Sequence, residues 1–200
     1  MVNSRSVASG FGSGVWVGRQ GGTSLIEVLV TIVILAIGLL GLAGLQSRLQ
    51  VSEMEAYQRA QALILLNDMA NRLASNHAQA GSYVTSSPVG VNVPDCSGLA
   101  VPDLAVWCDM LKGAGETAGG NNVGAMVGGR GCVEDLGSGE YLVTVAWQGL
   151  TPISAPPDGV ACGAGNYDGG NCTGDRCRRV VTTIVAIANL SSAGGVPPAP

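Results

Sequence analysis

The stretch that decides the fold is QGGTSLIEVLVTIVILAIGLLGLAGLQ, residues 20–46. Its part from residue 28 to residue 45 consists of 18 uncharged and mostly apolar residues. As a helix that rises about 1.5 Å per residue, this part spans about 27 Å, close to the bilayer core of about 30 Å. Glu27 stands directly before it, where an ionised carboxylate is costly. We therefore predict a membrane-embedded helix over residues 25–45 and ask why a glutamate stands at its front edge.

The helical pattern continues beyond the apolar run. No proline occurs in residues 23–87, and the first plausible helix stop is Gly81. We predict one helix over residues 24–80, about 85 Å long. It takes up nearly all of an N-terminal segment over residues 23–80, and residues 46–80 of this segment are amphipathic. Leucine and alanine residues recur at spacings of three, four or seven, the period of one helical face, at Leu42, Leu45, Leu49, Ala56, Ala60, Leu63, Leu66, Ala70 and Leu73.

Residues 1–22 carry Arg5 and Arg19 and no acidic residue. Positively charged flanks tend to stay in the cytoplasm, so we expect a single pass through the inner membrane with the N-terminus cytoplasmic. An ordinary secretory signal has a shorter apolar part, about 7–15 residues, followed by a small-residue cleavage site. Here the apolar run is longer, no convincing site of that kind follows, and the helical pattern goes on.

Helix capping is the simplest explanation of Glu27. Ser24 and Glu27 have the spacing of a capping box, in which each side chain bonds to the backbone N–H of the other residue. A carboxylate near a helix N-terminus also gains from the helix dipole. These two effects would account for the glutamate without any further function.

The residues GGTSLIE, 21–27, together with the basic leader and the long helix, resemble the cleavage and assembly signature of type IV prepilins. The resemblance implies a leader peptide over residues 1–22, cleavage between Gly22 and Thr23 by a prepilin peptidase, and methylation of the new N-terminus. It also implies that Glu27, the fifth mature residue, pairs with the N-terminus of a neighbouring subunit in the filament. Thr23 departs from the family, whose first mature residue is often Phe or Met; cleavage depends more on the preceding glycine, so we keep the site.

Gly38, Gly41 and Gly44 recur at intervals of three within the apolar run. Small residues let helices approach closely, which favours a packing role. The alternative is a weak helix that partly unwinds during assembly, because glycine costs about 1 kcal/mol relative to alanine in a helix interior. Many major pilins carry a proline where this chain has Gly44, and its absence here leaves both interpretations open.

Residues 81–200 are rich in Gly, Ser, Thr and Pro and poor in large apolar side chains, so their core is expected to need covalent support. We predict three disulfides formed in an oxidising compartment; free buried thiols are the alternative. The sequence does not choose among the many possible pairings. As a working hypothesis we take the neighbours along the chain: Cys96–Cys108, Cys132–Cys162 and Cys172–Cys177.

Within this second half, residues 104–112 are predicted as a short helix, and 141–147 and 179–190 as strands. One face of the first strand, with Tyr141, Val143, Val145 and Trp147, is expected to lie against the long helix.

The remaining segments are predicted as loops, namely 113–131, with its many glycines, 152–175, and a turn at Glu134-Asp135. Residues 191–200 are expected to form a disordered tail. The predicted fold class is α+β: a long N-terminal helix, transmembrane in its first part, packed on a small antiparallel β-sheet. Residues 81–200 would form a disulfide-bonded, extracytoplasmic pilin domain.

No set of residues for catalysis emerges. The net charge of −4 with no basic run argues against nucleic acid as a partner. His77 is the only histidine, and Ser138 lacks the frame of a nucleophilic serine. Asp168 and Asp175 offer oxygen ligands at loop spacing without the closing glutamate of a calcium loop. We predict no enzyme, no metal and no cofactor.

Further segments resemble the PilV-type minor pilins: IGLLGLAGLQ at 37–46, GRGC at 129–132, YLVTVAWQG at 141–149 and RRVV at 178–181. This resemblance implies a subunit that assembles with other minor pilins and the major pilin on an inner-membrane platform. It would prime the pilus, form its tip at the cell surface, and support twitching motility and adhesion. A minor pseudopilin of a type II secretion system and a surface adhesin module are the alternatives.

Overall fold

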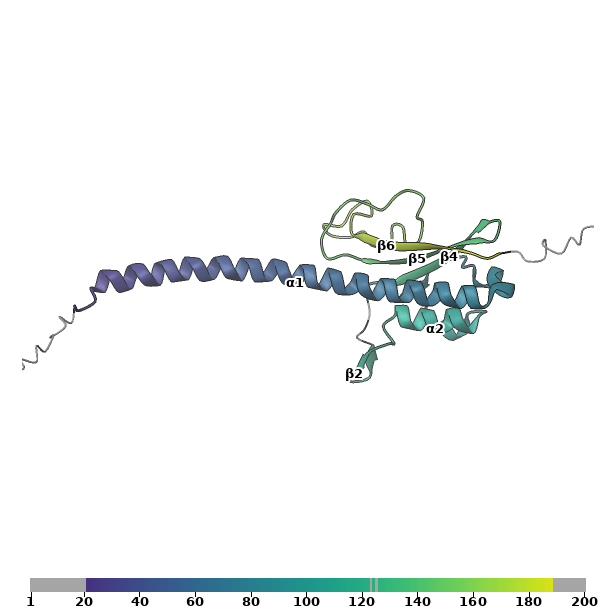
Figure 1. Cartoon of the computed structure of the whole chain (residues 1–200), viewed down its shortest axis with the longest axis horizontal. Helices are drawn as coiled ribbons and strands as arrows, with labels where there is room; N and C mark the ends of the chain where they lie inside the picture. Colours follow the sequence, from purple (N-terminus) through teal and green to yellow (C-terminus); the bar gives the residue numbers. More distant parts are fainter. Residues whose placement is uncertain (1–20, 123, 125, 189–200) are drawn as a thin grey trace, which may run out of the picture. The chain divides into compact units, whose positions relative to one another are not determined.

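The computed structural model of this chain describes residues 21–122, 124 and 126–188 (Figure 1). The chain divides into two compact units, Met1–Gln46 and Ser47–Pro200, which we call the N-terminal and the C-terminal unit. In chain order the elements are α1 (Leu25–Ser75), η1 (His77–Tyr83), β1 (Val89–Gly90), η2 (Cys96–Gly98), α2 (Pro102–Leu111), β2 (Thr117–Ala118), β3 (Asn121–Asn122), β4 (Arg130–Gly137), β5 (Glu140–Gln148) and β6 (Arg178–Ala186).

The C-terminal unit is built on an antiparallel sheet of four strands in the order β1-β4-β5-β6. Its centre is regular, since Val143 of β5 lies opposite both Val133 of β4 and Thr183 of β6. The predicted strands 141–147 and 179–190 correspond to β5 and β6, although residues 189–190 lie outside the described part. The predicted α+β class, a long N-terminal helix packed on a small antiparallel sheet, is confirmed.

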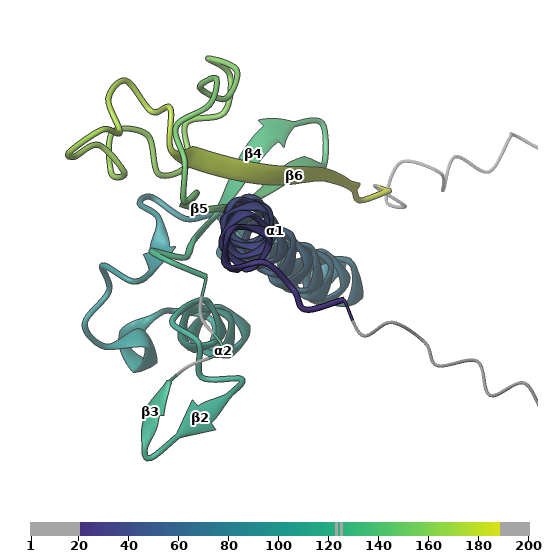
Figure 2. The same ribbon diagram turned by 90° about the vertical axis from the view of Figure 1, so that its left-hand side faces the viewer.

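Both α-helices of this unit cover the same face of the sheet (Figure 2). α2 packs on β4 at Gly131, where any added Cβ would collide with the ring of Trp107. Trp107 is fully buried, and its indole N–H donates to the Leu65 carbonyl of α1 at 2.9 Å, as a buried indole requires. As predicted, the face of β5 with Tyr141, Val143, Val145 and Trp147 belongs to this core.

The buried face of α1 differs from the predicted one. The predicted face is buried only at Leu66 and Leu73 and is exposed at Leu42, Leu45, Leu49, Ala56, Ala60 and Leu63. The buried residues of α1 are Gln58, Ala62, Leu65, Leu66, Met69 and Leu73. Residues 62–66 are Ala-Leu-Ile-Leu-Leu, apolar on every side of the helix, so their periodicity does not select one face. Leu63 and Ile64 therefore remain on the outside of the unit.

A second, smaller cluster lies on the other face of the sheet. It consists of Cys132, Ala146, Cys162 and Tyr167. The Tyr167 hydroxyl donates to the Gly128 carbonyl at 2.9 Å, and the Arg130 guanidinium lies 4.7 Å from the centre of the Tyr167 ring. Burial raises the pKa of Tyr167. The loop between β5 and β6 thus covers part of the outer face of the sheet.

The α-helix ends earlier than predicted. α1 stops at Ser75, and the chain continues to Tyr83 as the 3-10 helix η1, so the prediction of one α-helix over 24–80 is wrong at its end. Asn76 lies between the two helices with φ −104° and ψ 38°. Its side-chain amide donates to the Tyr83 hydroxyl at 2.7 Å and to the Asp103 carboxylate at 3.1 Å. The Asn76 side chain is thus bonded to side chains of η1 and α2 at the point where α1 ends.

Asp103 on α2 is the centre of a polar network at this helix end. It accepts a hydrogen bond from the Tyr83 hydroxyl at 2.5 Å and pairs with Arg72 at 2.8 Å. Arg72 also pairs with Asp68 at 2.8 Å. The Tyr83 hydroxyl, together with Arg72, lowers the pKa of Asp103 below its ordinary value. Burial and the neighbouring Asp103 carboxylate raise the pKa of Tyr83.

Strand β4 and three shorter strands were not predicted. The expected loop 113–131 contains the hairpin β2–β3 and the first residues of β4. The expected turn at Glu134-Asp135 lies inside β4, where Glu134 is opposite Leu142 of β5. β4 has glycines near both ends and acidic residues in its outer half, so its sequence lacks the alternation that marks a strand.

Candidate processing and assembly site

The predicted cleavage position lies in the non-helical residues that precede α1. Gly22 and Thr23 are exposed, and α1 begins two residues later at Leu25. A Cβ added at Gly22 would have no neighbouring atom within 4 Å among the described residues. The peptide bond between Gly22 and Thr23 is therefore accessible to a protease in this structure, and residues 1–20 of the predicted leader lie outside the described part.

Glu27 occupies the first turn of α1 and is exposed. Its backbone N–H donates to the Ser24 carbonyl at 3.0 Å. In residues 21–122, no side-chain hydrogen bond joins Ser24 and Glu27, so the reciprocal bonds of a capping box are not formed there. The carboxylate is thus close to the favourable end of the helix dipole and open to a further partner.

The apolar part of α1 is exposed among the described residues. Large apolar side chains of the N-terminal unit are exposed along its length, for example Leu29 at 55% and Leu40 at 74%. α1 is the one helix in the described residues that is long and apolar enough to cross a membrane, a statement about length and composition alone. The hydroxyl of Thr31 donates to the Val28 carbonyl at 2.8 Å, so this polar side chain is satisfied within the helix.

Gly38, Gly41 and Gly44 have open space beside them. A Cβ added at any of the three would meet no neighbouring atom within 4 Å among the described residues. Close packing of these glycines therefore requires another chain, and the structure leaves the choice between packing and unwinding open.

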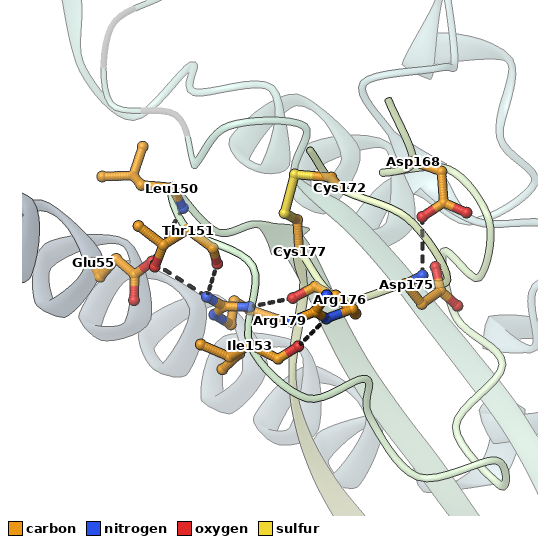
Figure 3. Close-up of a disulfide and its surroundings, with 10 residues drawn as sticks. All are labelled: Glu55, Leu150, Thr151, Ile153, Asp168, Cys172, Asp175, Arg176, Cys177 and Arg179. Carbon is orange, nitrogen blue, oxygen red and sulfur yellow. Dashed lines mark hydrogen bonds and ion pairs between the residues drawn. A yellow bond between two sulfur atoms is a disulfide. The ribbon is translucent and has the colours of Figure 1, made fainter. Parts of the chain in front are cut away.

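Three disulfides join the six cysteines, and their pairing is the one taken above from the order along the chain: Cys96–Cys108, Cys132–Cys162 and Cys172–Cys177. Cys132–Cys162 crosses from β4 to the loop that covers the outer face of the sheet. Cys172–Cys177 closes the end of that loop directly before β6 (Figure 3). The last two disulfides thus tie down the loop between β5 and β6.

Arg178 and Arg179 point to opposite faces of the sheet, as the sequence predicts for the start of a strand. Arg178 is buried; it lies 3.2 Å from the Asp175 carboxylate and donates to the Val160 carbonyl at 2.7 Å. Arg179 lies 3.3 Å from Glu55 of α1. The fold thus brings a carboxylate to each of the two arginines.

Arg179 also organises the loop after β5 (Figure 3). It donates to the Thr151 carbonyl at 2.6 Å and to the Arg176 carbonyl at 3.1 Å. The Glu55 carboxylate also accepts from the backbone N–H of Leu150 at 3.1 Å and from the Thr151 hydroxyl at 3.4 Å. These contacts join the loop, the first residues of β6 and the helix face.

Next to this network lies a hollow of about 410 Å³. It is lined by Ser52, Glu55, Ala56, Arg59, Trp147, Ile153, Arg179 and Val180. Sequence reasoning missed this site, since its residues come from α1, from β5 and the loop after it, and from β6, and carry no joint motif. Arg59 lies at its edge, and among the described residues no carboxylate is within 4 Å of it.

The oxygen ligands considered for calcium are used within the loop itself. The Asp168 carboxylate accepts the Asp175 N–H at 2.9 Å, and Asp175 accepts the Gly165 N–H at 2.8 Å. Across residues 21–122, 124 and 126–188, no three His, Cys, Asp or Glu residues converge in a way that would hold a metal. His77 is exposed at the start of η1, and Ser138 occupies the turn between β4 and β5.

Comparison with known proteins gives one match, at the N-terminus. The family model described as the prokaryotic N-terminal methylation motif matches residues 18–43. No curated protein and no solved structure matches the chain. The matched segment contains Gly22, Thr23 and Glu27 together with most of the apolar run, and it supports a type IV pilin-like or pseudopilin protein.

Proposed function

We propose that this chain is a PilV-like minor pilin of a type IV pilus, which assembles with other minor pilins to prime pilus biogenesis and form the pilus tip. The observation that carries the proposal is the methylation motif at residues 18–43 at the start of a helix whose apolar half is uncovered. Twitching motility and adhesion would follow from a correctly primed pilus. The proposal includes neither an enzymatic activity nor a cofactor.

The first step is processing at the inner membrane. The prepilin peptidase cuts between Gly22 and Thr23 on the cytoplasmic side and methylates the Thr23 amine. The accessible backbone at Gly22 supports this step. Mass spectrometry of the N-terminal peptide from native membranes should find a chain that begins with methylated Thr23. A chain that begins at Met1, or one cut after Leu45, would contradict the proposal.

A substitution at the cleavage position tests the same step. Gly22→Ala should allow some cleavage, because the added methyl group is small, whereas Gly22→Phe should block it. An immunoblot that separates precursor from mature chain measures the ratio. Complete processing of Gly22→Phe would move the cleavage site elsewhere.

The second step is docking into the filament through Glu27. A carboxylate in an apolar environment is expensive until it is paired, so the methylated N-terminus of a neighbouring subunit is a favourable partner. Glu27→Ala should be inserted and cleaved normally but should fail to enter pili. Glu53→Ala, an exposed glutamate further along α1, is the matched control. Normal piliation by the Glu27→Ala variant would remove the pairing role.

The outer face of α1 supports a place in a helical filament core. Leu63 and Ile64 are exposed at 40% and 59%, although they belong to the part of α1 that packs on the sheet. Together with the uncovered apolar half they offer a surface for the helices of the major pilin and other minor pilins. Before assembly, the same helix would hold the chain in the inner membrane beside the assembly platform.

The methylation motif fits a minor pseudopilin of a type II secretion system equally well, which makes that the second candidate. The two differ in the phenotype of a deletion strain. Loss of pili and of twitching, restored by the intact gene, would support the pilus; loss of protein secretion with normal pili would support the pseudopilin. A surface adhesin module is the third candidate, supported if the pilus-bound chain binds host cells or glycans directly.

A further inference from the structure

We propose that β6 is a docking edge, onto which an extended segment of a different polypeptide in the assembly adds as a fifth strand. The inference rests on the proposed function for the kind of assembly involved, and it adds the surface by which this subunit holds its neighbour.

The backbone N–H and C=O groups of β6 point alternately toward β5 and away from it. Ile187 N–H donates to the Gly139 carbonyl and Gly149 N–H donates to the Cys177 carbonyl, which sets the hydrogen-bonded positions of the β5–β6 pair. Because antiparallel pairing alternates, the odd-numbered residues of β6 bond to β5. The backbone groups of the even-numbered residues therefore point outward, at Val180, Thr182, Ile184 and Ala186.

The outward edge of β6 is open in the described part of the chain. Among the described residues, no backbone group outside the sheet bonds to the outward-pointing positions from Val180 to Ala186. At the opposite end of the sheet, the outer side of β4 is occupied by β1 and by Thr85, whose N–H donates to the Val133 carbonyl at 2.9 Å. In the strand order β1-β4-β5-β6, β6 is a terminal strand whose neighbour among the described residues is β5.

β6 lacks the features that usually prevent an edge strand from pairing with another chain. Natural edge strands carry charges, prolines or bulges that prevent pairing with other chains. Residues 180–186 are VVTTIVA, without charge or proline, and their register with β5 is continuous. Ile184 is exposed at 57%. A row of alternating N–H and C=O groups is satisfied by the backbone of another extended chain, which makes a polypeptide strand the matching occupant.

A second copy of this chain fits the edge less well than a different polypeptide. Antiparallel pairing of two β6 strands around a two-fold axis would set the α1 helices of the two copies in opposite directions. Subunits that enter one membrane from the same side share a direction. A neighbour that donates an extended segment is free of this constraint.

The hollow beside α1 indicates the charge that the partner segment carries. Val180 lines it, so it adjoins the first open position of the edge. Its lining includes Arg59 and Arg179 against one acid, Glu55. An acidic side chain at the end of the incoming segment would reach Arg59, which has no carboxylate within 4 Å among the described residues.

The test is site-specific photo-crosslinking of the full chain in its native membrane and pili. A photoreactive amino acid replaces Ile184, and in a matched control it replaces Val106, which is exposed at 46% on α2. We expect the probe at 184 to capture a different polypeptide, at a segment that mass spectrometry identifies, and the probe at 106 to capture far less of it. Equal yields at both positions, or capture of residues 189–200 of the same chain or of a second copy, would overturn the inference.

Proline provides the matched backbone variant. Thr182→Pro removes an outward N–H, which edge strands tolerate, whereas Thr182→Val keeps it. Thr182→Pro should retain protease resistance but lower the crosslinking yield from position 184 by about tenfold, corresponding to about 1.4 kcal/mol. Thr182→Val should retain the yield. If Thr182→Pro fails the protease test, Thr182→Lys replaces it, since a charge on the edge has the same expected effect. A folded variant of either kind with full yield would overturn the proposal.

Two further measurements test the acidic side chain of the partner and the proposed function separately. Arg59→Glu should lower the yield and Arg59→Lys should preserve it; full yield from Arg59→Glu would remove the acidic side chain from the proposal. Cleavage after Gly22 and presence in sheared pili are measured in the same samples. A processed, pilus-bound chain without capture at position 184 contradicts only the docking edge, whereas an unprocessed chain contradicts the proposed function.

Discussion

The two units of this chain use apolar residues in opposite ways. In the N-terminal unit the apolar side chains of α1 are exposed, and no other described residue of that unit covers them. In the C-terminal unit large apolar residues are fewer, but they are buried between two helices and a sheet, with three disulfides in support. Apolar content alone therefore says little about a core. The N-terminal unit depends on lipid or on other chains for its burial, and the C-terminal unit has its own core and disulfides.

The largest expected effect comes from the residue that joins the helices of the C-terminal unit. Trp107→Ala removes a fully buried side chain and its hydrogen bond to the Leu65 carbonyl. We expect a loss of about 3–5 kcal/mol in the free energy of unfolding, enough to unfold the unit under mild conditions. Protease resistance and near-ultraviolet circular dichroism of the full chain in detergent measure it.

The same variant tests whether the two units are independent. Membrane insertion of the Trp107→Ala chain should be normal, because α1 carries its own apolar surface. Val106→Ala, an exposed neighbour on α2, is the control and should be nearly silent. If the Trp107→Ala chain left the membrane fraction, the contrast between the units would fail.

The disulfides should rank by the length of chain that they close. By the loop-entropy relation, loss of Cys132–Cys162 costs about 3.6 kcal/mol, whereas loss of Cys172–Cys177 costs about 2 kcal/mol. Double serine variants of each pair, unfolded with heat in parallel, measure the order. Equal effects would mean that the pairs act through local packing rather than through the unfolded chain.

Glycine-to-alanine exchange should have opposite signs in the two units. Gly131→Ala brings a methyl group into the Trp107 ring and should destabilise the C-terminal unit by about 1–3 kcal/mol. Gly41→Ala meets nothing within 4 Å and should strengthen the helix by up to about 1 kcal/mol. Thermal unfolding of the C-terminal unit measures the first, and helicity in micelles measures the second. If Gly41→Ala chains have a stronger helix but fail to enter pili, Gly41 acts during assembly, either in close packing or in unwinding.

The smallest expected effect is a pH dependence limited to the C-terminal unit. The pKa of Asp103 is lowered from its ordinary 3.8 in the folded chain. Ionised Asp103 therefore stabilises the folded unit at a pH above its ordinary pKa. This stabilisation is lost as the pH falls through the lowered pKa of the folded state. Thermal unfolding should show a falling midpoint at acidic pH that Asp103→Asn makes shallower. Asp109→Asn, on the same helix, is the control, and an unchanged acid limb in the Asp103→Asn variant would contradict the network.

The sequence predicted the parts that have one strong periodic signal. The apolar run, the strand β5 and the helix α2 are identified by their composition and spacing. β4 could not be predicted, because its glycines and acids are explained only by the partners they meet, such as Gly131 against Trp107. The buried face of α1 was missed for the opposite reason, since residues 62–66 are apolar in all directions.

The candidate site divides in the same way. Gly22, Thr23 and Glu27 are neighbours in the chain, and a local motif is enough to find them. The pair Glu55–Arg179 and the hollow beside it unite residues that only the fold brings together. Two adjacent arginines indicated a strand with two different faces, but their acidic partners required the structure.

If the chain enters a filament as proposed, its disulfides have a mechanical consequence under tension. All three lie between Cys96 and Cys177, and none includes a residue of α1. A force on α1 is therefore resisted by non-covalent contacts alone, chiefly the core around Trp107 and the pair Glu55–Arg179. The disulfides keep about 160 Å of chain from extending, since each residue spans at most about 3.5 Å. Under a strong pull, α1 would separate from the sheet before the disulfide-closed segments could extend.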